Sequence, residues 1–248
     1  QAETDRCLAC GVCSECYQCV KACLAGAVDH AQCRQTREVK VGAVILAPGF
    51  KPYDPTLYET YSYAKHPNVV TSLEFERMLS ASGPYAGQLV RPSDHKEPKR
   101  IAWLQCVGSR DINHCDNGYC SSVCCMYANK QAVIAKEHSP EPLDATIFYM
   151  DMRTFGKDFD KYNLRAEDDH GVRFVRSRIH SVYPSPEERL RIVYATEAGP
   201  TAEEIFDLVV LSIGLTADPQ AVALAQRLGV ALNGYGFAQT QGTTPVQT

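Results

Sequence analysis

The sequence predicts an α/β protein with a doubly wound parallel sheet, preceded by a small cysteine-rich segment. Short, continuous apolar runs at 41–47, 101–106, 145–151 and 207–213 are typical of strands that are buried on both faces. Segments with a helical pattern stand between several of these runs, and this alternation favours parallel strands joined by crossover helices. Residues 1–36 show little apolar periodicity, so we expect bound metal to hold them together.

The first half of the chain contains one predicted strand and one predicted helix. The apolar run 41–47 indicates a buried parallel strand. Residues 50–71 are rich in proline and tyrosine and indicate an irregular covering loop. Residues 72–80 predict a short helix that is capped by Ser72, and residues 83–99, rich in proline, glycine and charge, are interpreted as a linker.

The second half repeats the strand and helix patterns. After the strand at 101–106, residues 119–136 predict a helix. The run 145–151 predicts the next strand, and the polar residues 158–169 predict a second helix. Shorter strands in a meander or crossover, and then a strongly apolar last strand, are expected at 172–175, 179–183, 190–194 and 207–213.

The composition is ordinary for a globular protein apart from the cysteines. Hydrophobic residues make up 45% and charged residues 22% of the 248 residues, and the net charge is −4. This charge argues against binding to nucleic acid or a membrane surface, which needs concentrated basic patches. No apolar run approaches the roughly 20 residues that span a bilayer. Because no signal-peptide pattern precedes the cysteines, we expect a reducing, cytoplasmic location. The first residue is Gln1, so we expect a fragment or a start elsewhere.

The twelve cysteines fall into two groups, and four in the first group have the spacing of a bacterial ferredoxin. Cys13, Cys16, Cys19 and Cys23 form C-x₂-C-x₂-C-x₃-C. Thiolates three residues apart on a tight loop can bind three iron corners of one cubane, with backbone N–H groups directed at the sulfurs. Zinc sites usually separate two short cysteine pairs by a dozen or more residues, so this spacing favours a [4Fe–4S] cluster.

The remaining cysteines of the first group leave alternatives open. Cys7 and Cys10 continue the same spacing backwards and are alternative ligands. Leu24 follows Cys23, where the ferredoxin motif has proline. In two-cluster ferredoxins the fourth cysteine binds the other cluster, so either a partner motif lies upstream or Cys7 and Cys10 contribute. Cys33 is isolated, and we interpret it as a buried or loop thiol.

Cys106, Cys120, Cys124 and Cys125 form a second motif, C-x₁₃-C-x₃-C-C. It lies at a strand, a turn and a helix start, where a dinucleotide-binding domain has G-x-G-x-x-G. Residues 107–111 read Val-Gly-Ser-Arg-Asp, so the nucleotide fingerprint is absent and cysteines take its place. The dipole of a helix lowers the pKa of thiols at its N-terminus, which suits them as metal ligands.

A catalytic disulfide is the competing interpretation of this second motif. Cys124 with Cys125, or Cys115 with Cys120, could form a reactive pair. Cys115 stands at an odd offset in a polar loop, and we expect it to be unligated. The seven histidines are scattered and none is paired with a carboxylate or a nucleophile by its spacing, so no acid or base catalyst is expected.

At these residues the sequence resembles a known family. The stretches Trp103–Asp111 (WLQCVGSRD) and Tyr119–Ala128 (YCSSVCCMYA) look like the signature of the heterodisulfide reductase A-subunit family. The match is long and unusual, and therefore far more specific than a lone C-x-x-C. Shorter matching segments, which together cover nearly the entire chain, lie at 13–30, 67–71, 81–84, 91–94 and 155–157.

The resemblance implies an iron–sulfur flavoprotein with Rossmann-like, thioredoxin-reductase-like FAD/NAD-type domains and a ferredoxin-like [4Fe–4S] insert. The second motif would bind one [4Fe–4S] cluster and the ferredoxin motif another. Ala47, Pro48 and Gly49 match the strand end that closes near FAD in this family. The family's glycine-rich flavin loop lies upstream of the ferredoxin insert, and its last flavin segment follows residues 242–248. The resemblance therefore implies the middle of a longer protein with an incomplete FAD site.

The same resemblance divides the chain into four parts. Residues 1–36 would form the ferredoxin-like segment and 37–99 part of an FAD-binding-type domain. Residues 100–216 would form a second Rossmann-like domain with the cysteine motif, and 217–248 a return segment toward the first domain.

The implied function is electron transfer in a heterodisulfide-reductase-like complex. Electrons would pass among the clusters and FAD and on to other redox subunits of an oligomer, with no nucleic acid and no direct membrane insertion. A pyridine-nucleotide-disulfide oxidoreductase is one rival, but it needs a second glycine fingerprint. A zinc-stabilised interaction module is another rival. A visible absorbance band in anaerobically purified protein would distinguish an iron–sulfur protein from both.

Replacing Cys16 by Ser is expected to remove about one cluster's worth of iron, because serine is a poor substitute for a soft thiolate ligand. Iron analysis and visible spectroscopy of the anaerobically purified variant check this expectation. Unchanged iron content and an unchanged spectrum would show that Cys16 is not a ligand.

Overall fold

A computed structural model describes residues 17–242 of the chain. Cys7, Cys10, Cys13 and Cys16 lie outside the described residues. The chain divides after Ala47 into two compact units, which are considered one at a time. The division into four parts at residues 36, 99 and 216 stays a prediction.

The described part of the first unit is a short helix followed by extended chain. Helix α1 (Gln18–Ala22) begins after Tyr17, and the N–H of Cys23 closes its last turn onto the carbonyl of Cys19 at 3.1 Å. The predicted strand 41–47 is wrong: these residues form no strand, and Val44 and Ile45 are 65% and 93% exposed. A strand needs a neighbour for its backbone groups, and no strand of the described chain pairs with this run.

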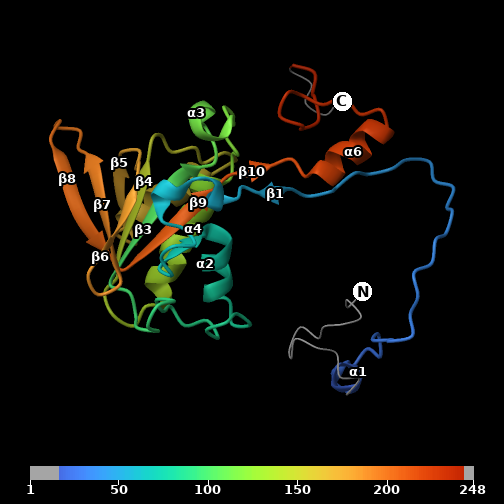
Figure 1. Cartoon of the computed structure of the whole chain (residues 1–248), viewed down its shortest axis with the longest axis horizontal. Coiled ribbons are helices and arrows are strands. Elements are labelled where there is room, and N and C mark those ends of the chain that lie inside the picture. The colour runs from blue at the N-terminus through green and yellow to red at the C-terminus, as the bar shows by residue number, and fades with distance from the viewer. Residues whose placement is uncertain (1–16, 243–248) are drawn as a thin grey trace. The chain divides into compact units, whose positions relative to one another are not determined.

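The second unit is built on a parallel sheet of five strands, in the order β2-β9-β3-β4-β5 (Figure 1). Every strand except the edge strands pairs on both sides, and β3 and β9 are buried almost throughout. The strands predicted near 101, 145, 172 and 207 are confirmed, whereas β2 lies at the end of the segment interpreted as loop. The bounds are Val69–Thr71 for β2, Arg100–Val107 for β3, Asp144–Tyr149 for β4, Arg173–Arg176 for β5 and Leu208–Ile213 for β9.

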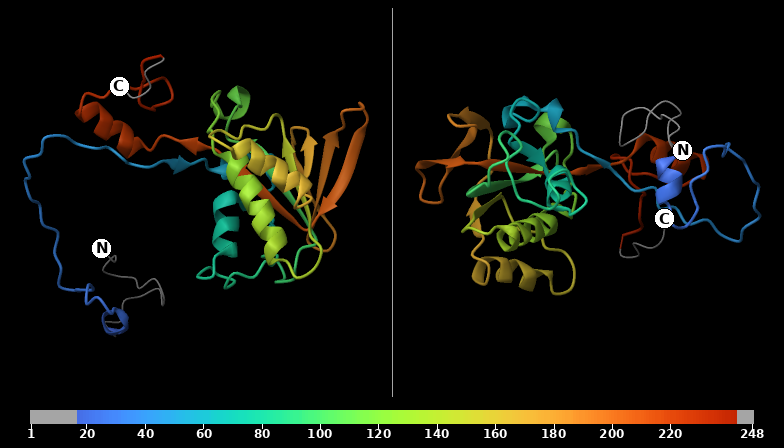
Figure 2. Two further views of the ribbon diagram at one scale, coloured as in Figure 1. Left: turned by 180° about the vertical axis from the view of Figure 1, so that it is seen from behind. Right: turned by 90° about the horizontal axis from the view of Figure 1, so that it is seen from below.

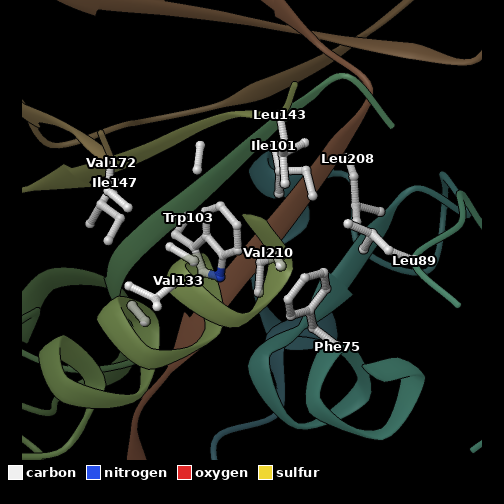
Figure 3. Packing of buried hydrophobic residues seen from close by; sticks show 14 of the residues in the cluster. Phe75, Leu89, Ile101, Trp103, Val133, Leu143, Ile147, Val172, Leu208 and Val210 are labelled. Carbon is white, nitrogen blue, oxygen red and sulfur yellow. The ribbon is translucent and has the colours of Figure 1, made fainter. Parts of the chain in front are cut away.

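Helices cover one face of this sheet. They are α2 (Ser72–Leu79), α4 (Cys124–His138) and α5 (Phe159–Asp168), and Figure 2 shows α4 and α5 side by side. Trp103 of β3 is fully buried beneath them, with its ring 5.5 Å from that of Phe75 and nearly perpendicular to it (Figure 3). The apolar positions of the predicted helices therefore pack against this face of the sheet.

The start of α2 differs by one residue from the prediction. Thr71, not Ser72, is the N-cap: its hydroxyl accepts a hydrogen bond from the Glu74 N–H at 3.2 Å. The Glu74 carboxylate accepts in return from the Thr71 N–H at 2.7 Å. This reciprocal capping box satisfies two backbone donors that a helix end leaves free.

The other face of the sheet is covered by an antiparallel meander and not by helices. Strands β6 (Val182–Ser185), β7 (Arg189–Ala195) and β8 (Thr201–Phe206) form it in that order. Their apolar side chains Leu190, Ile192 and Phe206 are fully buried in a second core against β3 and β9. The predicted doubly wound arrangement is therefore confirmed for the parallel sheet, but one of its two helical layers is replaced by β-structure.

Short elements complete the second unit. Strand β1 (Lys51–Pro52) pairs antiparallel with β10 (Leu215–Thr216), and α6 (Pro219–Arg227) follows the Asp218 cap with proline at its first position. The 3₁₀ helices η1 and η2 and the short helix α3 span Pro55–Leu57, Glu59–Tyr61 and Ile112–Cys115. Among the helices formed by residues 17–242, none is long and apolar enough to cross a bilayer.

Replacing Gly108 by Ala should lower the free energy of unfolding by about 2–5 kcal/mol, from left-handed backbone strain and overpacking together. Gly108 has a φ of +73°, and an added Cβ would lie 2.0 Å from the Tyr53 ring. Gly171 is the matched control: its φ is +60°, but nothing lies within 4 Å of an added Cβ. Gly171→Ala should cost only about 1–2 kcal/mol. Urea unfolding followed by Trp103 fluorescence measures both, and equal losses would contradict the predicted packing of Tyr53.

Candidate functional site

Four cysteines far apart in the sequence line one small cavity at the carboxyl end of the parallel sheet. Cys106 lies near the end of β3, Cys120 in the following loop, and Cys124 and Cys125 at the first two positions of α4. Ligands of open α/β sheets bind at this end of the strands. The structure thus brings together all four residues of the predicted second motif.

A bulge in β3 directs Cys106 into the site. The pairing of β3 with β9 shifts register between Leu104 and Val107. Cys106 has a φ of +63°, a left-handed conformation that costs energy for any residue other than glycine. Bulges of this kind redirect side chains next to functional sites, and residues held in strained conformations cluster there.

Hydroxyl groups fasten the loop before α4 to the end of the sheet. The Ser109 and Ser121 hydroxyl oxygens lie 2.8 Å apart, and the Ser121 oxygen also accepts from the Leu215 N–H at 2.9 Å. Tyr119 donates its hydroxyl to the Leu215 carbonyl at 2.7 Å. Because these residues bond to the sheet end, α4 begins at Cys124 and not at the predicted residue 119. Cys120 therefore precedes the helix.

Burial is the main cause of the raised pKa values of Cys106, Cys124 and Cys125. Burial raises the pKa of Cys124 to about 12 and that of Cys125 to about 11. Burial also raises the pKa of Cys106, although Arg110 opposes this shift. The expected lowering of the thiol pKa by the helix dipole is therefore wrong for Cys124 and Cys125. Protonated, buried thiols are poor nucleophiles, which argues against a catalytic disulfide here. Metal binding is different, because it displaces the protons itself.

Two arginines and a carboxylate line the same cavity. The Asp151 carboxylate lies between Arg110 and Arg153, with the Arg153 Nε 3.1 Å from Asp151 Oδ1 and the Arg110 Nη2 3.2 Å from Oδ2. Sequence reasoning missed both arginines and Asp151, although Asp151 and Arg153 follow β4 directly and so fall at the carboxyl end of the sheet. The excess positive charge favours an anionic occupant.

The donor set fits an iron–sulfur cluster better than a single metal ion. Zinc needs each thiolate sulfur about 2.3 Å from one ion. No three Cys, His, Asp or Glu residues within 17–242 are arranged to hold a metal ion in that way. A cubane presents four separate iron corners, so its thiolates can stand farther apart. The cavity is small, about 10 Å³, so its lining would have to shift to admit a cubane.

One backbone donor already points at a sulfur of this set. The Ser122 N–H donates to the Cys120 Sγ at 3.4 Å, and Ser122 has a φ of +62°. The Cys124 thiol donates to the Ile213 carbonyl at 3.6 Å. N–H donors to thiolates are the usual surroundings of iron–sulfur clusters.

Cys115 does not line the cavity. Its thiol donates to the Asp111 carbonyl at 3.1 Å, and its side chain packs against the second core. The Asp111 carboxylate lies 2.9 Å from His114 Nδ1 and accepts from Arg178 at 2.6 Å. The expectation that no histidine pairs with a carboxylate is wrong for His114 and also for His66, whose Nε2 lies 3.5 Å from the Glu188 carboxylate. The Asp111 carboxylate also caps α3 by accepting from the His114 N–H. That Cys115 is unligated stays a prediction.

In the ferredoxin-like motif, two of the four cysteines belong to the described chain. The Ala27 N–H donates to the Cys23 sulfur at 3.4 Å and is the main cause of the lowered pKa of this thiol. The Cys19 sulfur lies 3.2 Å from the Nε2 of His30, a neighbour that the scattered histidine pattern did not indicate. A lowered thiol pKa suits a metal ligand.

The residues matched to a flavin contact do not form a site by themselves. Ala47, Pro48 and Gly49 are all exposed, and an added Cβ at Gly49 would meet nothing within 4 Å. Their contact with FAD stays a prediction, and no step is derived through FAD.

Comparisons with known proteins identify relatives over most of the chain. The chain is 41% identical over 226 residues to the A subunit of the H(2):CoB-CoM heterodisulfide,ferredoxin reductase of Methanothermobacter marburgensis. The aligned region covers 91% of this chain and 34% of the relative. The chain is 45% identical over 215 residues to an iron–sulfur A subunit of the CoB–CoM heterodisulfide reductase of Methanopyrus kandleri, with 86% and 32% covered. A protein of Archaeoglobus profundus that resembles the same A subunit is 37% identical. No family model matches. The chain spans about a third of the length of these relatives.

Titration with NADH or NADPH should show no saturable binding at the turn between β3 and α4. Four cysteines line the place where a pyrophosphate would lie, and the glycine fingerprint is absent. Fluorescence titration or calorimetry checks this. Micromolar binding of NADH or NADPH that is lost when Gly108 is substituted would refute this prediction.

Proposed function

Since this chain belongs by sequence to the heterodisulfide reductase A-subunit family, we propose that it is an iron–sulfur electron-transfer part of such an oxidoreductase. The observation that carries the proposal is the convergence of four thiols on one cavity beside two arginines. In this proposal, one [4Fe–4S] cluster is bound by Cys106, Cys120, Cys124 and Cys125. A cluster bound there would supply one-electron transfer.

The protein's own residues would supply position, charge and exclusion of water. Cys106, Cys124 and Cys125 are buried, so three of the four ligands would be shielded from solvent. Arg110 and Arg153 would offset the negative charge of four thiolates. No general acid or base is needed, because the proposed chemistry moves electrons and leaves covalent bonds of the protein unchanged.

The longer protein would hold a second cluster and a flavin. The ferredoxin-like motif would bind the second [4Fe–4S] cluster through Cys13, Cys16, Cys19 and Cys23, with Cys7 and Cys10 as further candidates. Support comes from a relative in Methanocaldococcus jannaschii, which is named as an iron–sulfur subunit and is 41% identical over 237 residues. FAD would bind elsewhere in the longer protein, near Ala47, Pro48 and Gly49.

The proposed partners are other redox subunits of a heterodisulfide-reductase-like complex. The relatives are named as A subunits of such enzymes, which supports an assembly of several chains. A reducing compartment such as the cytoplasm is part of the proposal, because clustered cysteines with metal-ligand spacing are typical of proteins there.

Replacing Cys124 by Ser should remove one cluster's worth of iron and its electron paramagnetic resonance signal after reduction, because a ligand is lost. Cys115→Ser is the matched control: this cysteine ends α3, in the same connection between β3 and α4 but outside the cavity, so iron and signal should be kept. Both variants are assayed after anaerobic purification.

The reverse outcome would mean that Cys115 is a ligand and that the four-cysteine assignment is wrong. Retention of all iron in both variants would reject a cluster at this site. A zinc content that replaces iron in the unaltered protein would favour the zinc-stabilised interaction module.

A further inference from the structure

The bulge in β3 carries buried polar groups that have no partner within residues 17–242. Both amide atoms of the Gln105 side chain and the hydroxyl of Ser212 lack a hydrogen bond. Gln105 is 8% exposed and Ser212 is fully buried. Buried polar side chains are nearly always paired, so these groups call for a ligand or another polar neighbour.

Strand register places the two residues directly opposite each other at the bulge. Between Leu104 and Val107, two residues of β3, Gln105 and Cys106, oppose one residue of β9, Ser212. The unpartnered hydroxyl and amide therefore flank the strand position of a proposed cluster ligand, next to the residues that line the cavity and not among them.

Alternation along the strands places both side chains on the face that the helices cover. Trp103 and Val210, two residues earlier in β3 and β9, lie in the core beneath α2 and α4 (Figure 3). Side chains two residues apart in a strand share a face, so Gln105 and Ser212 belong to this face. One of the helices on this face, α4, begins with Cys124 and Cys125.

Direct contacts tie the end of β9 to these cysteines. The carbonyl of Ile213, the residue after Ser212, accepts from the Cys124 thiol at 3.6 Å and also from the Tyr127 hydroxyl. Ser212 is thus one residue from a backbone atom that touches a proposed ligand, and Gln105 is one residue from Cys106.

We propose that the Gln105 amide and the Ser212 hydroxyl donate hydrogen bonds to sulfur atoms of the cluster and raise its reduction potential. The proposal rests on the proposed function, because it assumes the cluster at these cysteines. Reduction adds one electron to the cluster. Donors aimed at its sulfurs stabilise the more negative, reduced form, and hydrogen bonds to the sulfurs are a known determinant of cluster potential. Removing them therefore makes the potential more negative.

The test is a redox titration of the full-length protein with Ser212→Ala and Gln105→Met, which remove the donors at similar size. The titration follows the electron paramagnetic resonance signal of the reduced cluster that Cys124→Ser is expected to abolish.

Each variant should keep its iron, and its ratio of reduced to oxidised cluster at a fixed potential should fall several-fold. A tenfold fall corresponds to about 59 mV for a one-electron couple. Ser212→Thr keeps the hydroxyl and should keep the potential. Thr60→Val removes another unpartnered buried hydroxyl, outside the bulge, and should also leave the potential unchanged.

A measurement on the unaltered sequence covers the case in which a variant fails to fold. With glutamine labelled with ¹⁵N in its side chain, pulsed electron paramagnetic resonance should detect a nitrogen coupling to the reduced cluster. Unchanged reduction potentials in both variants would overturn the inference. It would also be overturned if, in deuterated water, the pulsed experiment detected couplings from deuterium of buried water but none from the glutamine nitrogen. Absence of iron from the unaltered protein would instead reject the proposed function.

Discussion

The parallel pairing of β3 with β9 is the constraint on which the rest of the site depends. Both strands are buried between the helices and the meander, so neither can shift without disrupting two cores. The one register shift falls at Gln105 and Cys106. Downstream of it, the chain must return across the end of β9, where Ser121 and Tyr119 bind Leu215. Topology, more than cysteine spacing, brings the four thiols together.

The sequence predicted the buried strands well because continuous apolar runs leave few other structures open to them. It failed where the outcome depends on neighbours. The run 41–47 has the composition of a buried strand, yet it is exposed because no described strand pairs with it. Strand β8 was missed because its polar residues Glu203 and Glu204 hide the alternation. Glu204 forms ion pairs with Arg100 and Arg173, which no local pattern indicates.

In the candidate site too, features set by residues close in sequence were predicted, and features set by tertiary contacts were not. The cysteine motif is local information and was found from spacing and resemblance. The thiol acidity was misjudged, because the helix dipole acts over one turn while desolvation depends on everything packed above Cys124 and Cys125. Asp151 and Arg153 were missed for a related reason: their relevance follows only from β4 lying next to β3 in the sheet.

Several departures from ordinary folding rules meet at the cysteine site, although left-handed residues and unpartnered buried polar atoms also occur elsewhere in the described chain, for example at Ala64 and Thr60. Cys106 has a strained left-handed backbone, Cys124 and Cys125 are buried thiols with raised pKa values, and Gln105 and Ser212 are buried without partners among the described residues. Each departure alone lowers stability, and natural sequences keep such conflicts chiefly at functional sites. A ligand that takes thiolates, accepts hydrogen bonds at sulfur and carries negative charge toward Arg110 and Arg153 would relieve most of them together. An iron–sulfur cluster meets all three requirements, whereas a disulfide meets none of them.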